Sequence, residues 1–253
     1  MRSLIRSPLW LLGLVVSVVF GSVFYLFAEA WVGPSIVPGA TATGLIILVV
    51  FSIRVIGERL EAIEIFGISV MIIGIILLGL SGLSIPSSEV NFNQTDFLIR
   101  FVIYSVMLVI FWLMAQISAS KSEANKGVLY AVSVGLIWTI SDLWVFPLVA
   151  TIGLFFSWTF TAIEIGVFIA ACIILILTNI YGVRQTQIAY RFLQVNKVQP
   201  IQESTTQLSP ILIYFVVVGK TATPLSTILV LIAVVLIIGS SFLIMRRNIE
   251  YNL

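Results

Sequence analysis

Long apolar stretches separated by short polar turns follow one another along almost the whole chain. A helix of about 20 predominantly apolar residues is long enough to cross the hydrocarbon core of a bilayer. The stretches that approach this length are residues 8–30, 37–56, 63–82, 97–117, 127–149, part of 160–194, 200–219 and 224–245. The pattern predicts an all-α fold, a polytopic membrane helical bundle of about eight transmembrane helices.

The sixth stretch allows two registers. Hydropathy places it at residues 160–181, whereas its register with the first stretch moves it towards 170–194. One long helix that starts near residue 160 and continues past Arg184 accommodates both. Pro200 and Pro224 begin the last two stretches, and both are predicted to occupy first-turn positions, where a helix tolerates proline well.

The seventh stretch differs from the others because its first half is polar. Contact between lipid and such side chains is costly, so they are predicted to face a protein interior or a watery cavity. The polar residues are Gln202, Glu203, Ser204, Thr205, Thr206, Gln207 and Ser209. This is the first indication in the sequence of a pathway for a solute.

The seventh stretch also shares its plan with the second. Pro200 and Gly219 each lie 162 positions after a residue of the same type, Pro38 and Gly57. Between proline and glycine, both stretches pass from small or polar residues to aliphatic ones. The similarity predicts an internal structural repeat.

Basic residues indicate how the helices cross the membrane. With the N-terminus inside, eight spans leave only Arg100 and Lys220 of the thirteen Lys and Arg residues on the outer side. This bias predicts a plasma-membrane protein with both termini cytoplasmic. With the same eight spans, the two related units start from opposite sides of the membrane and are therefore inverted with respect to each other, as in many secondary transporters. The polar loop 83–96 is predicted to be external and to separate a shortened first helical module, 1–82, from a second module, 97–253.

Composition narrows the chemistry that the chain can perform. Its residues are 60% hydrophobic and only 9% charged, which excludes a soluble domain, and the basic residues form no patch for a nucleic acid. The absence of histidine excludes His-based triads and HExxH metalloproteases. The single cysteine, Cys172, excludes a disulfide within the chain. We therefore expect neither enzymatic activity nor a cofactor, and no metal ligands are assigned.

Glu203 is the first candidate for a substrate-binding or coupling residue. Gln207, Pro210 and Tyr214 follow it at spacings of four, three and four, which places all of them on one helical face. A carboxylate in this position binds a cation or carries a proton, and Pro210 is predicted to kink the helix. The alternative is a first-turn carboxylate at the positive end of the helix, near Lys197 at the cytoplasmic surface.

Asp142 is the second candidate, because an ionisable group deep in an apolar stretch suggests a function. The alternative is a structural role as the partner of Arg100 or of a hydroxyl such as Thr139. Its neighbours Trp138 and Trp144 either stack on an organic substrate or pack in the core.

Four further features complete the predictions. Glu29, near the outer end of the first stretch, is a candidate for the pathway. Gln187 is another if the sixth helix follows the longer register, and Gln185 and Arg191 then join it. Gly67 and Gly74 permit close approach between helices. The charged residues Arg54, Glu58, Arg59, Glu61 and Glu64 are predicted to form a solvated turn with local ion pairs.

Several runs carry a family resemblance. Residues 57–79, GERLEAIEIFGISVMIIGIILLG, resemble the end of the five-helix module of the drug/metabolite transporter superfamily, the EamA-like permeases. AYRFLQVNKVQP at 189–200 and VVVGKTATPLS at 216–226 resemble the matching region of the second module. LYAVSVGLIWTISD at 129–142 is similar to the NIPA-type magnesium transporter branch. Members usually have ten helices in two sets of five, so the resemblance implies an incomplete first module. Either the start of the sequence is truncated, or this is a shortened member that completes its bundle otherwise, for example as a homodimer.

The resemblance implies a multi-pass transporter that moves a small solute or metabolite by alternating access. A Mg²⁺ or other divalent cation transporter is an alternative within this class. From another class, a membrane assembly subunit without transport activity also fits the pattern. The expected partners are the small-molecule or ion substrate, the lipid bilayer and a second copy of the chain.

Overall fold

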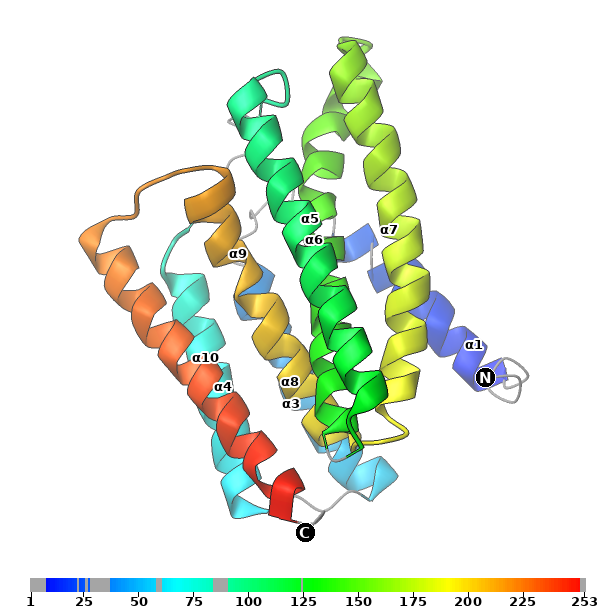
Figure 1. The fold of residues 1–253 in the computed structure, drawn as a ribbon, viewed down its shortest axis with the longest axis vertical. Coiled ribbons are helices and arrows are strands. Elements are labelled where there is room, and N and C mark those ends of the chain that lie inside the picture. Colours follow the sequence, from blue (N-terminus) through cyan, green and yellow to red (C-terminus); the bar gives the residue numbers. More distant parts are fainter. Residues whose placement is uncertain are drawn as a thin grey trace.

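The computed structural model describes residues 8–21, 23–25, 27, 37–57, 61–83, 91–123 and 125–250. These residues form helices joined by turns, and no strand occurs among them (Figure 1). The elements are α1 (Pro8–Val15), η1 (Val16–Gly21), α3 (Val37–Phe51), η2 (Ser52–Ile56), α4 (Ala62–Leu80), α5 (Thr95–Lys121), α6 (Lys126–Ser157), α7 (Ala162–Ala189), α8 (Val195–Gln207), α9 (Ser209–Leu212), η4 (Ile213–Val217) and α10 (Pro224–Glu250), where η marks a π-helix.

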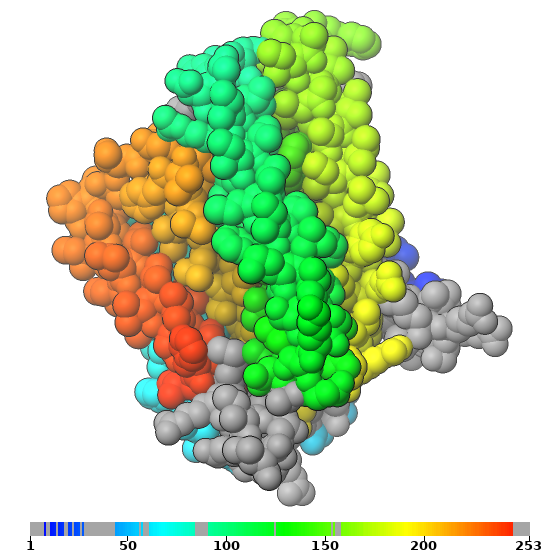
Figure 2. Space-filling view, in the orientation of Figure 1, coloured from blue at the N-terminus to red at the C-terminus, as the bar shows by residue number. Residues whose placement is uncertain are grey.

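Within the described residues, five helices are long and apolar enough to cross a membrane: α4, α5, α6, α7 and α10. Their outward faces are aliphatic; on α5, which lies along the front of Figure 2, Ile103, Ile110 and Met114 are exposed. A soluble protein of this size would bury such faces, so they indicate an integral membrane protein. The helical membrane bundle is thereby confirmed, and the total of eight spans stays a prediction.

The sixth stretch is one continuous helix, α7, which runs from Ala162 to Ala189 and so includes Arg184. Thr161 and Glu164 form a capping box at its start, which satisfies the free N–H groups of the first turn. The interpretation of a single long helix is confirmed.

The helical hydrogen bonding of the seventh stretch is interrupted near its middle. α8 ends at Gln207 and α9 starts at Ser209 with Pro210 in its first turn, whereas Leu208 between them keeps right-handed helical backbone angles, with φ of −78° and ψ of −21°. The prediction for Pro200 was wrong, because α8 begins at Val195 and Pro200 lies inside it. The prediction for Pro224 is confirmed, since it is the first residue of α10.

α4 and α10 form an antiparallel pair (Figure 1). Gly67 near the start of α4 lies against Ile244 near the end of α10, whereas Gly74 lies against Ile237 and Ala233, farther towards the start of α10. A Cβ atom on Gly74 would be 2.9 Å from Ile237 Cγ1 and 3.2 Å from the Ala233 carbonyl oxygen. The two helices therefore approach closely through glycine, as predicted.

α5, α6 and α7 form a second group, and α8 lies between this group and the α4–α10 pair (Figure 1). α8 crosses α6 at Gly135, where a Cβ atom would be 2.6 Å from Thr205 Cβ and 2.8 Å from the Gln202 carbonyl oxygen. Every residue of α8 is buried or half-buried. The polar half of the seventh stretch thus faces protein, as the sequence predicted.

The turns at the two ends of the bundle are held by different contacts. At one end, the Asn93 amide donates to Glu164 Oε1 over 3.2 Å, and the Thr161 hydroxyl donates to Asn93 Oδ1 over 3.0 Å. At the other end, the Lys126 ammonium lies 5.2 Å from the centre of the Phe192 ring. These contacts join the turn before α5 to the start of α7, and the start of α6 to the α7–α8 turn.

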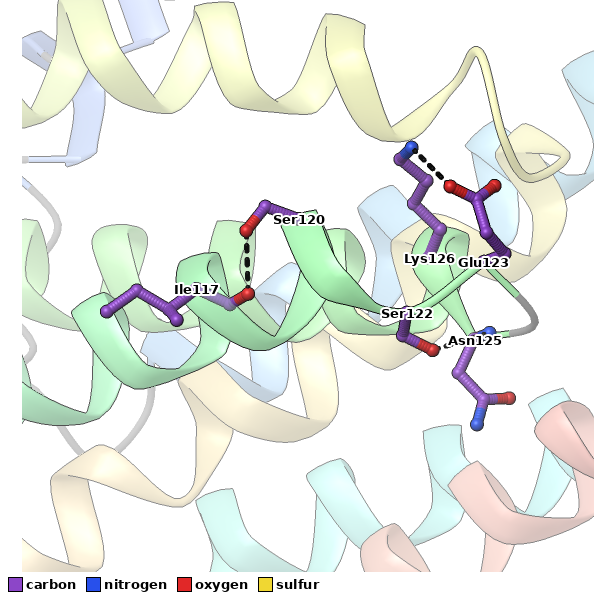
Figure 3. Close-up of polar contacts among 6 residues, drawn as sticks. All are labelled: Ile117, Ser120, Ser122, Glu123, Asn125 and Lys126. Atoms are coloured by element: carbon purple, nitrogen blue, oxygen red, sulfur yellow. Dashed lines mark hydrogen bonds and ion pairs between the residues drawn. The ribbon is translucent and has the colours of Figure 1, made fainter.

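The turn between α5 and α6 is fixed by short-range polar contacts (Figure 3). The Ser122 hydroxyl accepts the Asn125 N–H over 3.2 Å, and Lys126 Nζ lies 3.7 Å from Glu123 Oε1. Because 91% of the Glu123 side chain is exposed, this surface ion pair contributes little to stability.

The crossing of α6 and α8 should depend on the absence of a side chain at position 135. We expect Gly135→Ala to lower the free energy of unfolding by about 1–3 kcal/mol, since the atoms in its way belong to a backbone and a Cβ and cannot rotate aside. Unfolding in mixed micelles on titration with a denaturing detergent measures this. Gly166→Ala on α7 is the matched control, since no described neighbour lies within 4 Å of its Cβ position. Equal losses for the two variants would contradict the close crossing.

Candidate functional site

Glu203 lies in a ladder of side chains that recur every four residues on α8. The Gln199 amide donates to Glu203 Oε1 over 3.2 Å, and the Gln207 amide donates to Glu203 Oε2 over 3.1 Å. The spacing of four brings such side chains together on one face of a helix. Both oxygens of the carboxylate are therefore held by neutral donors of the same helix.

A tyrosine extends this ladder towards the end of the bundle at which α8 begins. The hydroxyl of Tyr190, the residue that follows α7, donates to Gln199 Oε1 over 3.4 Å. A continuous row of hydrogen bonds thus leads from the α7–α8 turn through Gln199 to Glu203 and Gln207. The position of the Glu203 carboxylate is coupled to the position of that turn.

Asp142 approaches this row from α6. Its carboxylate is hydrogen-bonded by the Tyr25 hydroxyl and interacts electrostatically with Glu203. Both residues are half-buried inside the helical bundle. Two ionisable groups of the same sign therefore lie near each other in the interior of the protein.

The two partners proposed for Asp142 from the sequence lie elsewhere. The Arg100 guanidinium lies against Gly219, and the Thr139 hydroxyl donates to the Thr205 carbonyl over 3.5 Å. No described basic side chain forms an ion pair with Asp142 or Glu203. Among the described residues, the two carboxylates are therefore held by amides and a phenol.

Lys197 forms an ion pair with Glu64 of α4 and not with Glu203. Its Nζ atom is 2.9 Å from Glu64 Oε1, and only 10% of the Lys197 side chain and 4% of the Glu64 side chain are exposed. Glu203 is the ninth residue of α8, about 12 Å along the axis from its start, so the first-turn interpretation was wrong. The prediction that Glu64 belongs to a solvated turn was wrong as well.

The buried Glu64 carboxylate has a second role at the start of α4. Its Oε2 atom accepts the Glu61 N–H over 3.1 Å within a capping box. One oxygen thus satisfies the backbone of α4 and the other binds Lys197. This ion pair fixes the first turn of α8 to the first turn of α4.

The amide of Gln185 forms a separate polar network between α5, α6 and α7. Its Oε1 atom accepts from Trp112 Nε1 over 3.2 Å and from the Ser133 hydroxyl over 3.3 Å, and Gln116 Nε2 donates to Ser133 over 2.8 Å. Trp112 and Gln116 were not candidates from the sequence. In the sequence, two polar groups four residues apart in an apolar stretch, the Trp112 indole N–H and the Gln116 amide, could have indicated them.

The remaining sequence candidates lie apart from the two carboxylates or outside the described residues. Gln187 is half-buried on α7 and makes no side-chain hydrogen bond within the described part of the chain. Glu29 lies outside the described residues. Pro210 stands at the break between α8 and α9, one turn beyond Gln207.

The two tryptophans next to Asp142 in the sequence, Trp138 and Trp144, both pack against other helices. Trp144 packs edge-on against Phe101, with ring centres 5.0 Å apart, so its role is packing. Trp138 packs against α7, where a Cβ atom on Gly182 would be 2.9 Å from its ring. Among the described residues, no three His, Cys, Asp or Glu side chains are close enough to hold a metal ion.

Comparison of the chain with protein-family models, with curated proteins and with solved structures finds no match. The resemblance to EamA-like permeases therefore stays an expectation, and function has to be argued from the site itself.

The Glu64–Lys197 pair should contribute strongly to stability. We expect Lys197→Met to lower the free energy of unfolding by about 3–5 kcal/mol, because it leaves a buried carboxylate without its counter-charge. Adding Glu64→Gln to this variant should recover part of the loss. The exposed acid of Figure 3 is the control, and Glu123→Gln should cost no more than about 1 kcal/mol. Detergent-titration unfolding measures all four proteins, and a loss under about 1 kcal/mol for Lys197→Met would refute the assignment.

Proposed function

We propose that the protein is a membrane transporter that moves a small solute by alternating access, with Glu203 as the group that contacts the substrate or a coupling ion. The observation that carries this proposal is a half-buried carboxylate inside the helical bundle that is held by Gln199 and Gln207 and forms no ion pair within the described part of the chain. Asp142 is the second carboxylate of the proposed site. A protonated or cationic species supplies the missing positive charge when it binds there.

The contrast between two carboxylates of the same chain supports the proposal. Glu64 is buried for a structural purpose, and it has both an ion pair with Lys197 and a hydrogen bond from a backbone N–H. Glu203 has neither within the described part of the chain. A carboxylate without a counter-charge in a membrane interior is costly, and such groups mark substrate or ion pathways. The two acids therefore differ in the partners that the described residues give them.

The interrupted seventh stretch is a second line of support. α8 stops one turn after Glu203, a single residue separates it from α9, and a π-helix follows at once. Transporters bind solutes next to discontinuous helices, whose freed backbone groups bind ions and whose breaks allow movement. The break and the carboxylate lie on the same segment.

Local geometry favours the inverted repeat within this proposal. η2 leads to Gly57 with φ of 77°, and η4 leads, after Val218, to Gly219 with φ of 73°. α4 starts at Ala62 and α10 at Pro224, again 162 positions later. The antiparallel packing of α4 on α10 is the arrangement that inverted, related helices would have. Eight spans in two EamA-like modules, the first incomplete, belong to the same proposal.

The proposed orientation follows from the basic residues. Lys121, Lys126 and Arg191 lie in or next to the turns at one end of the bundle, whereas Arg100 and Lys220 lie towards the other end (Figure 1). By the positive-inside rule we propose that the first end is cytoplasmic and that both termini are cytoplasmic as well. The plasma membrane is the location that we propose.

Neutralising Glu203 should slow transport strongly without unfolding the protein. The purified parent, Glu203→Gln and Glu123→Gln are first screened by thermal shift against amino acids, nucleosides, organic cations and Mg²⁺, because a ligand of the native state raises its stability. Uptake of each stabilising compound into proteoliposomes follows. We expect Glu203→Gln to reduce the initial rate about 10- to 100-fold, the value of a charge-assisted hydrogen bond, and Glu123→Gln to leave it unchanged.

The other possible results of the thermal-shift and uptake experiments decide between the alternative functions. If Mg²⁺ alone stabilises the parent and enters the vesicles, the protein is a divalent cation transporter. If no compound stabilises or enters, the proposal fails and a membrane assembly subunit becomes the better account. Full uptake by the folded Glu203→Gln protein would remove Glu203 from the site.

A further inference from the structure

The first half of α8 is held on two sides by contacts that the site itself does not require. On one side, the buried Lys197–Glu64 pair joins it to α4 over 2.9 Å. On the other side, the Tyr190 hydroxyl joins Gln199 to the end of α7 over 3.4 Å. Lys197 and Gln199 are neighbours within the first two turns of the helix, so both contacts act at the same end.

The opposite end of α8 lacks part of its helical hydrogen bonding. Pro210 has no N–H with which to bond the preceding turn, and α8 passes into α9 at Leu208, where the backbone stays right-handed helical. The first half of α8 can therefore move about this point once the ion pair of Lys197 and the hydrogen bond of Gln199 at its other end separate. Glu203 lies between the two ends, so its carboxylate would move with the helix.

We infer that the Glu64–Lys197 ion pair and the Tyr190–Gln199 hydrogen bond form a latch that closes the cytoplasmic end of α8. This inference rests on the proposed function, because a latch matters only if α8 moves during alternating access. The two contacts must separate before the segment around Glu203 becomes accessible from the end at which α8 begins.

The latch is also connected to the site. Gln199 uses its Oε1 atom to accept from Tyr190 and its Nε2 atom to donate to Glu203. A solute or proton that takes over the Glu203 oxygen removes the second of these bonds and frees Gln199 to turn. Occupation of Glu203 would thereby loosen the Tyr190 contact, leaving only the ion pair to be broken.

A single reporter cysteine tests the latch. Cys172 is the only native cysteine, so Cys172→Ala gives a cysteine-free background. Ser204→Cys then places a thiol on α8 next to Glu203, at a position that is only 9% exposed. The rate at which a membrane-impermeant, charged thiol reagent labels it in detergent-purified protein measures how often this part of α8 becomes accessible.

We expect Lys197→Met and Tyr190→Phe each to increase the labelling rate of Ser204→Cys about tenfold or more. The charge swap Glu64→Lys with Lys197→Glu should return the rate towards that of the parent. Tyr130→Phe is the matched control for the hydroxyl, because Tyr130 stacks on Phe192 and makes no hydrogen bond through its oxygen within the described residues. Its labelling rate should equal that of the parent.

A second reporter separates latch opening from general unfolding. Ala171→Cys places a thiol at a fully buried position of α7, away from α8. Its labelling should not change in the latch variants. Equal acceleration at both reporters, or no acceleration at Ser204→Cys in either variant, would overturn the latch.

Failure of the latch and failure of the proposed function give different results. If the parent transports a solute and the latch variants label like the parent, the transporter proposal stands and the latch falls. If the latch variants label faster but no solute in the panel is ever transported, the two contacts do restrain α8, and their role in alternating access is rejected.

Discussion

A polar helix enclosed by apolar ones is the constraint on which this architecture depends. α8 carries glutamines, a glutamate, serine and threonines into a bundle whose outer faces are aliphatic, and each polar group there needs a partner within the protein. Part of the need is met locally: the hydroxyls of Ser204 and Thr206 donate to the carbonyls of Ile201 and Gln202. The amides at positions 199 and 207 meet a further part by binding the carboxylate between them, whereas the buried Gln202 Oε1 atom has no hydrogen-bond partner among the described residues. The surrounding helices can then remain apolar and face lipid.

The charged side chains in the interior differ in the partners that they have. Lys197 and Glu64 neutralise each other and fix two helix starts together, so breaking them would leave a buried charge. Asp142 and Glu203 interact electrostatically with each other and, within the described residues, have only neutral hydrogen-bond partners, so two simultaneous negative charges are costly there. In the transport site that we propose, a single positive species bound by both would relieve that cost. Among the described residues, one interior acid thus has a basic partner and two have neutral ones.

The sequence was sufficient for what depends on local pattern. The stretches 37–56 and 63–82 agree within a residue or two with the helices found there, because length, hydropathy and glycine act on neighbouring residues. Gln207 could be assigned to Glu203 for the same reason, as a spacing of four fixes the contact. The partners of Lys197 and Asp142 could not be predicted, since Glu64 and Tyr25 are more than a hundred residues away and only tertiary packing brings them close. The start of α8 was misplaced because proline at position 200 suggested a boundary that the packed helix overrides.

If the second and seventh stretches are related copies, they have diverged at the positions that matter for the site. With the offset of 162 positions, Thr41 corresponds to Glu203 and Leu45 corresponds to Gln207. Leu45 is 3% exposed and belongs to the hydrophobic core. Neither replacement supplies a charge, so the first copy keeps the helix, its π-turn and its final glycine without the acid. One helix of the pair therefore provides packing while the other carries the ionisable group. A solute entering between two such helices would meet charge on one side only, which fixes its orientation as well as its affinity.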